Sequence, residues 1–168
     1  MDSLDLDVTR KRAGEEFLQS LERLGLRPEA LFWAFDRVED RLVLVLATEL
    51  FDLKGPRAVF DLLVKAYRAS ALPREIDPFV VRLHSPEHRL IRYLDGWHQD
   101  DADGTRRYGL APEQRDRPAP ATSMMVEVDD IEFKTDWVYR FRLPKRRDVG
   151  AVRREWERFH RKVERLAA

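Results

Sequence analysis

The sequence predicts an α+β fold in which a mixed or antiparallel sheet with two hairpins is covered by about four helices. Amphipathic segments, with apolar residues every three or four positions, predict the helices. Short runs rich in β-branched and aromatic residues, separated by turn residues, predict the strands. The chain has 168 residues, 43% of them hydrophobic, which fits one domain over residues 1–168. The predicted order is α-ββ-α-β-α-loop-ββ-α.

In the first half of the chain, the sequence predicts a helix, a hairpin and a second helix. Thr9 is a possible N-cap for the first helix, and Gly25 is placed to close it. The runs 31–35 and 42–46 flank a polar turn and predict a hairpin. Because the second run is apolar at every position, we expect it to lie centrally with both faces covered. A Gly-Pro pair at 55–56 opens the next helix.

The second half adds strands on either side of a long polar segment. The predicted elements are a strand over 79–83, a helix from 85 to 96, a flexible loop over 98–123, strand character over 124–128, 131–133 and 137–143, and a C-terminal basic amphipathic helix over 148–166. In the last strand, aromatic residues alternate with Arg140 and Arg142, which predicts one core face and one basic face.

Composition excludes several classes of chemistry. The chain has no cysteine, so it contains no disulfide, cysteine-ligated zinc or cysteine nucleophile. No segment resembles a signal peptide, and the longest apolar run, 42–47, is much shorter than the roughly 20 residues of a membrane-spanning helix. We therefore expect a cytoplasmic protein with no membrane partner.

One segment near the end of the chain matches the acid-x-Lys element of metal-dependent nucleases. Asp129, Asp130 and Glu132 are possible Mg²⁺ ligands, and Lys134 would steady the attacking water. Such a site also needs an acid from a preceding paired strand, and the triplet arises easily by chance where 37% of residues are charged. A Mg²⁺-dependent nuclease is therefore an alternative rather than the main hypothesis.

A second metal motif has the wrong local context. His84, Glu87 and His88 match the H-x-x-E-H pattern of zinc proteases, whose histidines stand one helical turn apart. Pro86 and the Ser85 cap separate a strand end from a helix start, so we do not expect the two histidines to converge on a metal. No metal site and no cofactor are predicted.

The C-terminal helix carries the strongest pattern. Its apolar residues form a seam with spacings of 3, 4, 3, 4 and 3, and they are Val149, Val152, Trp156, Phe159, Val163 and Leu166. A seam of this kind either docks on the domain or pairs with a second copy. At 100° per residue, one row of arginines lies roughly 160° away from the seam. This row is Arg154, Arg158, Arg161 and Arg165.

Charge is also unevenly distributed along the chain. Residues 140–168 contain eleven Lys and Arg against four Asp and Glu, whereas residues 1–139 contain twenty against twenty-seven. Like charges at i,i+4 repel by a few tenths of a kcal/mol, and an anionic partner would neutralise them. The alternative is a merely solvated face, which is common on charged helices.

The sequence therefore favours a non-catalytic binding or assembly module that contacts an acidic protein surface or nucleic acid. The predicted binding residues belong to the last strand, the helix entrance and the arginine row, and they are Arg140, Arg142, Arg146, Arg147, Arg154, Arg158, Arg161 and Arg165. Two alternatives remain: the Mg²⁺-dependent nuclease, and a structural protein that forms homodimers through the apolar seam.

Overall fold

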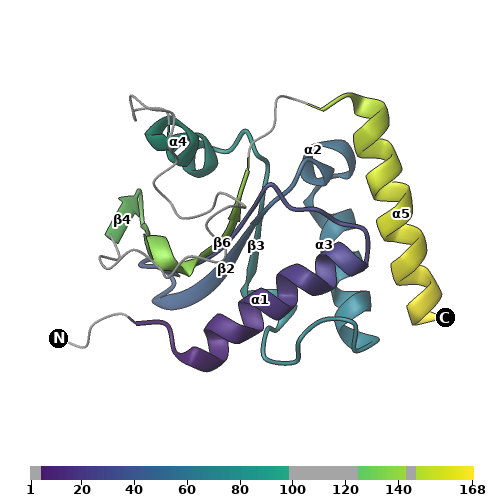
Figure 1. Cartoon of the computed structure of the whole chain (residues 1–168), viewed down its shortest axis with the longest axis horizontal. Coiled ribbons are helices and arrows are strands. Elements are labelled where there is room, and N and C mark those ends of the chain that lie inside the picture. The colour runs from purple at the N-terminus through teal and green to yellow at the C-terminus, as the bar shows by residue number, and fades with distance from the viewer. Residues whose placement is uncertain (1–4, 99–124, 143–146) are drawn as a thin grey trace.

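A computed structural model describes residues 5–98, 125–142 and 147–168, and has the α+β architecture predicted from the sequence (Figure 1). These residues form five α-helices and a six-stranded mixed sheet. The elements are α1 (Val8–Arg23), β1 (Ala30–Asp36), β2 (Arg41–Ala47), α2 (Leu50–Lys54), α3 (Pro56–Arg68), the 3-10 helix η1 (Pro78–Val80), β3 (Val81–His84), α4 (Arg89–His98), β4 (Met125–Val128), β5 (Ile131–Lys134), the 3-10 helix η3 (Thr135–Trp137), β6 (Val138–Phe141) and α5 (Val149–Ala167).

The hairpin β1–β2 forms the centre of the sheet. Its antiparallel register runs from Ala30 opposite Ala47 to Asp36 opposite Arg41, as the two hydrophobic runs predict. The other edge of β2 pairs in parallel with β3, and α2 and α3 form the connection between them. Residues 43–47 are completely buried, which confirms that this strand lies centrally.

Two strands share the second edge of β1. β5 pairs with its end at Phe35 and Asp36, and β6 pairs with its start from Ala30 to Phe32. β4 then pairs with β5 to make the second hairpin. The sheet has one strand more than the predicted order because each of the three runs predicted over 124–128, 131–133 and 137–143 forms a strand of its own, β4, β5 and β6.

Three predicted boundaries move because polar side chains cap different residues. Asp7, not Thr9, is the N-cap of α1, and its side chain accepts a hydrogen bond from the backbone of Arg10. Asp77 caps η1, so β3 begins at Val81 rather than at residue 79. Residues 85–88 form a turn, and α4 begins at Arg89. The loop predicted over 98–123 lies outside the described residues, except that α4 continues to His98.

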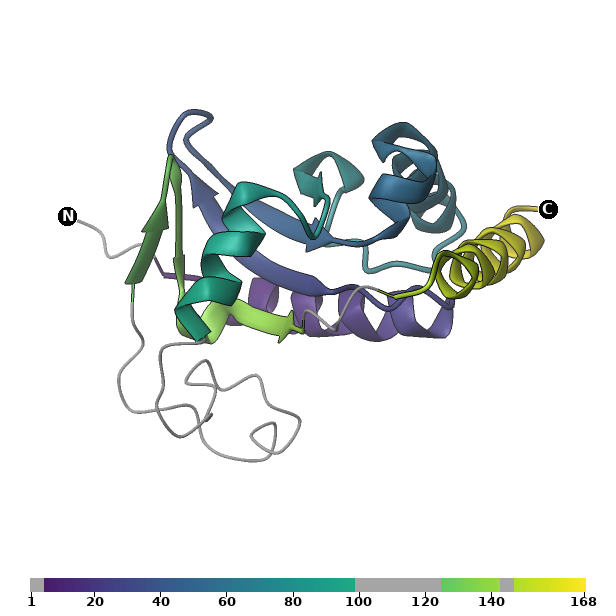
Figure 2. The ribbon, with the colours of Figure 1, turned by 90° about the horizontal axis from the view of Figure 1, so that it is seen from above.

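Helices lie on both sides of the strands. In Figure 1 the strands run between α1 below and α4 above, and Figure 2 shows α3 on the side of the β1–β2 hairpin opposite to α1. Trp33 Nε1 and the Tyr139 hydroxyl donate to backbone carbonyls of α1, at Arg10 (3.2 Å) and Lys11 (2.8 Å). A Cβ at Gly14 would lie 2.3 Å from the Tyr139 ring, so this close approach requires glycine.

Candidate functional site

The helix α5 carries the predicted site and is docked on its own domain. It begins after Asp148, whose side chain accepts a hydrogen bond from Gly150 N at 2.7 Å and caps the helix. α5 lies beside α2 and α3 at one end of the molecule (Figures 1 and 2). Phe159 and Val163, at the centre of the predicted seam, are 0% exposed. The middle of the seam is therefore already covered within the chain.

The ends of the seam do not share this burial. Val149 and Leu166 are 59% and 53% exposed, and Trp156 is half-buried beneath Lys54, whose Nζ lies 5.7 Å from the ring centroid. Glu155, which the apolar pattern did not include, is 2% exposed. The buried stripe thus follows residues 152, 155, 159 and 163, and the helix is rotated slightly from the heptad seam.

All four arginines of the row are exposed: Arg154, Arg158, Arg161 and Arg165. Arg154 lies 3.9 Å from Asp148, a long and exposed contact. Among the described residues, the guanidinium groups of the other three form no ion pair with any carboxylate. The row therefore presents uncompensated positive charge to solvent.

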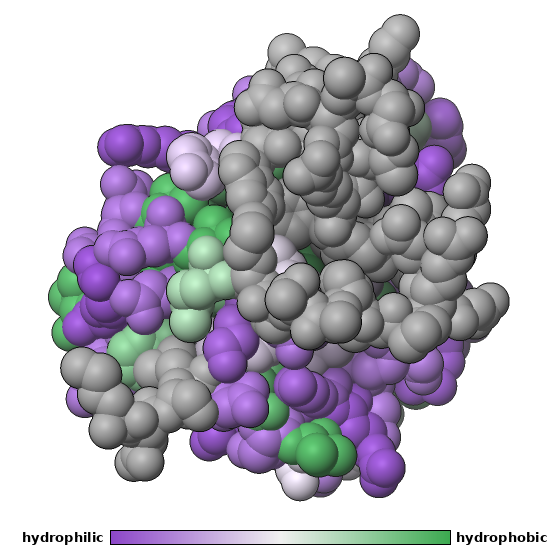
Figure 3. All heavy atoms as spheres, turned by 60° about the vertical axis from the view of Figure 1, so that its left-hand side comes forward, coloured by the Kyte–Doolittle hydropathy of each residue, from purple (hydrophilic) through white to green (hydrophobic). Residues whose placement is uncertain are grey.

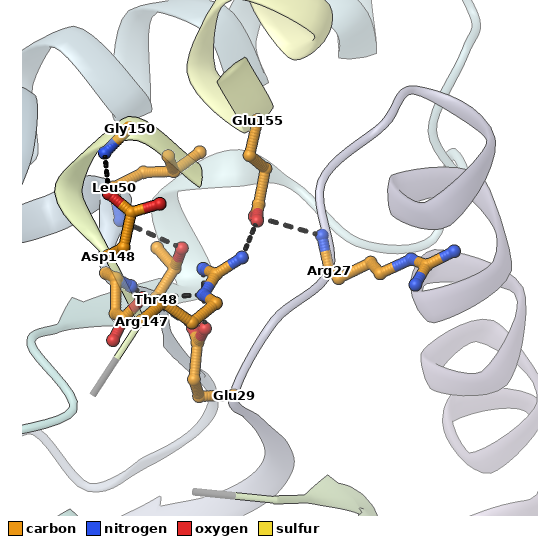
Figure 4. A network of polar contacts seen from close by, with 9 residues as sticks. Arg27, Glu29, Thr48, Leu50, Arg147, Asp148, Gly150 and Glu155 are labelled. Atoms are coloured by element: carbon orange, nitrogen blue, oxygen red, sulfur yellow. Dashed lines mark hydrogen bonds and ion pairs between the residues drawn. The ribbon is translucent and has the colours of Figure 1, made fainter. Parts of the chain in front are cut away.

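Of the other predicted binding residues, Arg147 faces inward instead (Figure 4). Its Nη2 lies 2.9 Å from Glu29, its Nε lies 2.6 Å from Glu49, and its Nη1 is paired with Glu155. The three acids come from the chain before β1, the start of α2 and the buried side of α5. Arg147 thus joins three separate parts of the fold, and each of its three guanidinium nitrogens contacts a carboxylate.

The network contains more carboxylates than cations, and this affects protonation. Burial raises the pKa of Glu29 from 4.5 to about 8, opposed by the charge of Arg147 and supported by the charges of Glu155 and Glu49. Burial also disfavours the charged form of Arg147, but hydrogen bonds and charges from the acids outweigh it and raise its pKa. When Glu29 carries a proton, Arg147 faces two negative charges instead of three, and the buried network holds less uncompensated negative charge.

The remaining predicted residues differ from one another. Arg140 Nη1 lies 2.9 Å from Glu22 at the end of α1, so this cation is paired within the chain. The side chain of Arg142 is exposed, while its backbone N–H donates to the carbonyl of Glu29. Arg146 lies outside the described residues.

The residues of the nuclease alternative surround the second hairpin. Asp129 and Asp130 form the turn between β4 and β5, and Asp129 has a positive φ of 54°. Asp129 lies 3.6 Å from Arg89, and Lys134 lies 3.6 Å from Asp5. These side chains are thus engaged in exposed ion pairs with other parts of the chain.

A second acid does stand across the hairpin from Glu132. Glu127 on β4 is its register partner, as a two-strand metal site would require. However, Arg37 lies between them, with its Nη2 2.7 Å from Glu127 and its Nη1 2.9 Å from Glu132. A guanidinium therefore occupies the position that a metal ion would need. The described residues include no group of three His, Asp or Glu arranged to hold a metal.

The two histidines lie close together. The rings of His84 and His88 lie 4.1 Å apart with an interplanar angle of 34°, because residues 85–88 turn back before α4 begins. The sequence predicted only that the two histidines need not converge on a metal, and the contact between their rings arises from this turn. Burial, followed by the charges of His88 and Arg82, lowers the pKa of His84 to about 4. The two rings form a tilted contact in which His84 is neutral at pH 7.

The rest of the described surface offers no comparable feature. On the face drawn in Figure 3, apolar atoms appear in separate places among hydrophilic ones. The most exposed large apolar side chains, Val8, Val38 and Phe79, belong to different parts of the chain. Within the described ranges, no helix has both the length and the apolar character that crossing a bilayer requires.

Two further basic residues lie beside α5, and the sequence pattern did not place them among the predicted binding residues. Arg23, the last residue of α1, and Arg27, four residues later, are exposed and lie on either side of Gly25 in the sequence. Their place beside α5 depends on tertiary contacts, so no spacing rule could find them. The chain matches no protein-family model, no curated protein and no solved structure in the comparisons made.

Proposed function

We propose that this protein is a non-catalytic binding or assembly module of the cytoplasm, which contacts an acidic partner through the outer face of α5. The observation that carries the proposal is the arginine row, whose three members after Arg154 are exposed without an intramolecular counter-charge. Each guanidinium offers five N–H donors, which suit carboxylates and phosphates. A partner bearing such groups would remove the repulsion along the row.

The docking of α5 also supports this function. Apolar burial at Phe159 and Val163, and the ion pair between Lys65 and Glu164, hold the helix on the domain. The row is therefore presented by a fixed helix rather than by a free tail. A preorganised surface binds with a smaller loss of conformational entropy. Arg147 and Arg140 contribute indirectly, by fixing the chain around the helix.

The other two hypotheses have less support. A homodimer through the seam would have to use Phe159 and Val163, which are already buried within the chain. A nuclease would have to displace Arg37 from between Glu127 and Glu132.

The test is a charge reversal of the row, Arg161→Glu with Arg165→Glu. The matched control, Arg12→Glu with Arg57→Glu, makes the same charge change at exposed residues of α1 and α3. Two labelled probes would be used in fluorescence anisotropy: a 20-residue glutamate-rich peptide and a 20-bp DNA duplex. We expect the row variant to lose at least about tenfold in affinity for the probe that the protein binds, and the control to keep its affinity.

Salt dependence adds a second measurement. Contacts to several phosphates impose a steep loss of duplex affinity between 50 and 200 mM salt, on the order of 1000-fold for six or more contacts. If neither probe binds the unchanged protein, or if the row variant and the control lose affinity equally, the proposed function is refuted. Unfolding in urea would confirm that both variants remain folded.

A further inference from the structure

The segment that ends α1 and one flank of α5 lie against each other through direct polar contacts. Lys162 Nζ donates to the carbonyl of Arg23 at 3.0 Å, and the backbone N–H of Arg27 donates to Glu155 at 3.3 Å. These contacts place the segment 23–27 along one side of α5. Arg23 and Arg27, whose side chains are exposed, therefore lie next to the part of α5 that carries Arg158 and Lys162.

Gly25 brings the two elements into close approach. It has a φ of 89°, and a Cβ built on it would lie 2.8 Å from Cγ and 3.1 Å from Cδ of Arg158. The stem of Arg158 therefore passes across this glycine, between the positions of Arg23 and Arg27. Figure 4 shows the Arg27 side chain pointing away from Glu155 and the internal network. Its charge is thus directed to the outside.

We propose that these residues form one binding surface, the α1–α5 basic surface, which receives an acidic segment of a partner protein. This inference rests on the proposed function and extends it from one helix to two elements. The printed contacts bring together Arg23, Arg27, Arg158 and Lys162, and the surface continues along the arginine row to Arg161 and Arg165.

The limited extent of the surface favours a protein partner over nucleic acid. The arginine row extends from Arg154 to Arg165, twelve residues of helix and about 16 Å. Acidic side chains border it, since Glu157 is exposed on α5 and Glu22 stands before Arg23. Residues 1–139 also carry seven more acidic than basic residues. A long polyanion would meet repulsion beyond the patch, whereas a short acidic segment would not.

The absence of an aromatic platform supports the same choice. Proteins that bind single-stranded nucleic acid stack bases on exposed rings. The aromatic residues of α5 are Trp156, covered by Lys54, Phe159, which is buried, and His160, which stacks against Trp156 with centroids 5.7 Å apart. The row itself therefore offers guanidinium groups without a stacking partner. Its spacing of 4, 3 and 4 residues matches carboxylates repeated along one face of a partner helix.

The test compares charge reversal on the two elements. The variants are Arg23→Glu with Arg27→Glu on the α1 side, Arg161→Glu with Arg165→Glu on α5, and Arg12→Glu with Arg57→Glu as control. The probes are the glutamate-rich peptide and the DNA duplex. We expect the α1-side variant to lose at least about tenfold in peptide affinity, as the α5 variant does, while the control is unchanged. We also expect the peptide to bind more tightly than the duplex at 150 mM salt.

The outcomes separate this inference from the proposed function. Loss of affinity in the α5 variant alone would overturn the two-element surface and leave the proposed function standing. Loss in neither variant would overturn both. Tighter binding of the duplex would overturn the choice of a protein partner. If Arg23→Glu with Arg27→Glu unfolds the protein, the milder pair Arg23→Gln with Arg27→Gln replaces it, with an expected loss of about threefold or more.

Discussion

Replacement of Arg147 by methionine tests the internal network most directly. Methionine keeps the length and much of the apolar stem of the side chain but removes its charge and all its donors. Glu155, whose side chain is only 3% exposed, would then face Glu49 without a cation, beside Glu29, which is 5% exposed and already protonated at pH 7. To relieve this repulsion, the carboxylates must bind protons or the entrance to α5 must open.

We expect this substitution to lower the free energy of unfolding by a large amount. Removal of one partner from a buried ion pair costs about 3–5 kcal/mol, because the remaining charge stays buried without compensation. A domain is stable by about 5–15 kcal/mol, so this change removes a substantial part of its stability. For a domain of this size, each kcal/mol corresponds to about 2–4 °C, which predicts a fall in Tm of about 6–20 °C.

Urea unfolding at pH 7, followed by tryptophan fluorescence, measures this cost. The control is Arg142→Met, which makes the same chemical change at an exposed side chain five residues away. Addition of Glu155→Gln to the Arg147→Met protein should restore part of the lost stability, because it removes one buried charge. A loss below about 1 kcal/mol, or equal to that of the control, would refute the structural role of Arg147.

Three further predictions concern stability. Because the pKa of Glu29 is about 8 in the folded protein and 4.5 ordinarily, the folded state retains a proton between these values. Stability should then fall as pH rises through this window, by up to about 1.4 kcal/mol per pH unit, and Glu29→Gln should flatten the profile obtained from urea titrations. Phe159→Ala should cost about 3–5 kcal/mol in the same assay, whereas Leu166→Ala should cost under about 1 kcal/mol. Gly25→Ala should cost about 1 kcal/mol or more, because a positive φ and the stem of Arg158 both oppose a Cβ; an unchanged Tm would contradict this.

Local patterns predicted most of the fold. The hairpin β1–β2, the central position of β2 and the helices α1, α3 and α5 all follow from apolar periodicity and turn residues. Boundaries were predicted less well where two polar residues compete to cap the same helix. Asp7 caps α1 in place of Thr9, and Asp77 extends a 3-10 helix into the predicted strand. Such competition depends on which donor each side chain can reach, and spacing alone does not decide it.

The candidate site was predicted only in part, because charge patterns do not show which cations are paired. Periodicity placed the row of Arg154, Arg158, Arg161 and Arg165 on the outer face of α5. It could not show that Arg147 and Arg140 meet acids about 118 residues away in the chain. The same limitation applies to Arg23 and Arg27, whose neighbours on α5 are equally distant in sequence. Contacts of this range follow from tertiary packing and leave no local pattern.

The shared edge of β1 has a consequence for the folding pathway. β2 joins β1 through a short turn, whereas β5 and β6 reach the other edge only after about a hundred intervening residues have been brought together. Closing so large a loop costs conformational entropy before any contact between the strands offsets that cost. Domains with many distant pairings fold more slowly than those with local ones. We therefore expect the β1–β2 hairpin to form first during folding. Pairing of β5 and β6 with the second edge of β1 would then be the slower step.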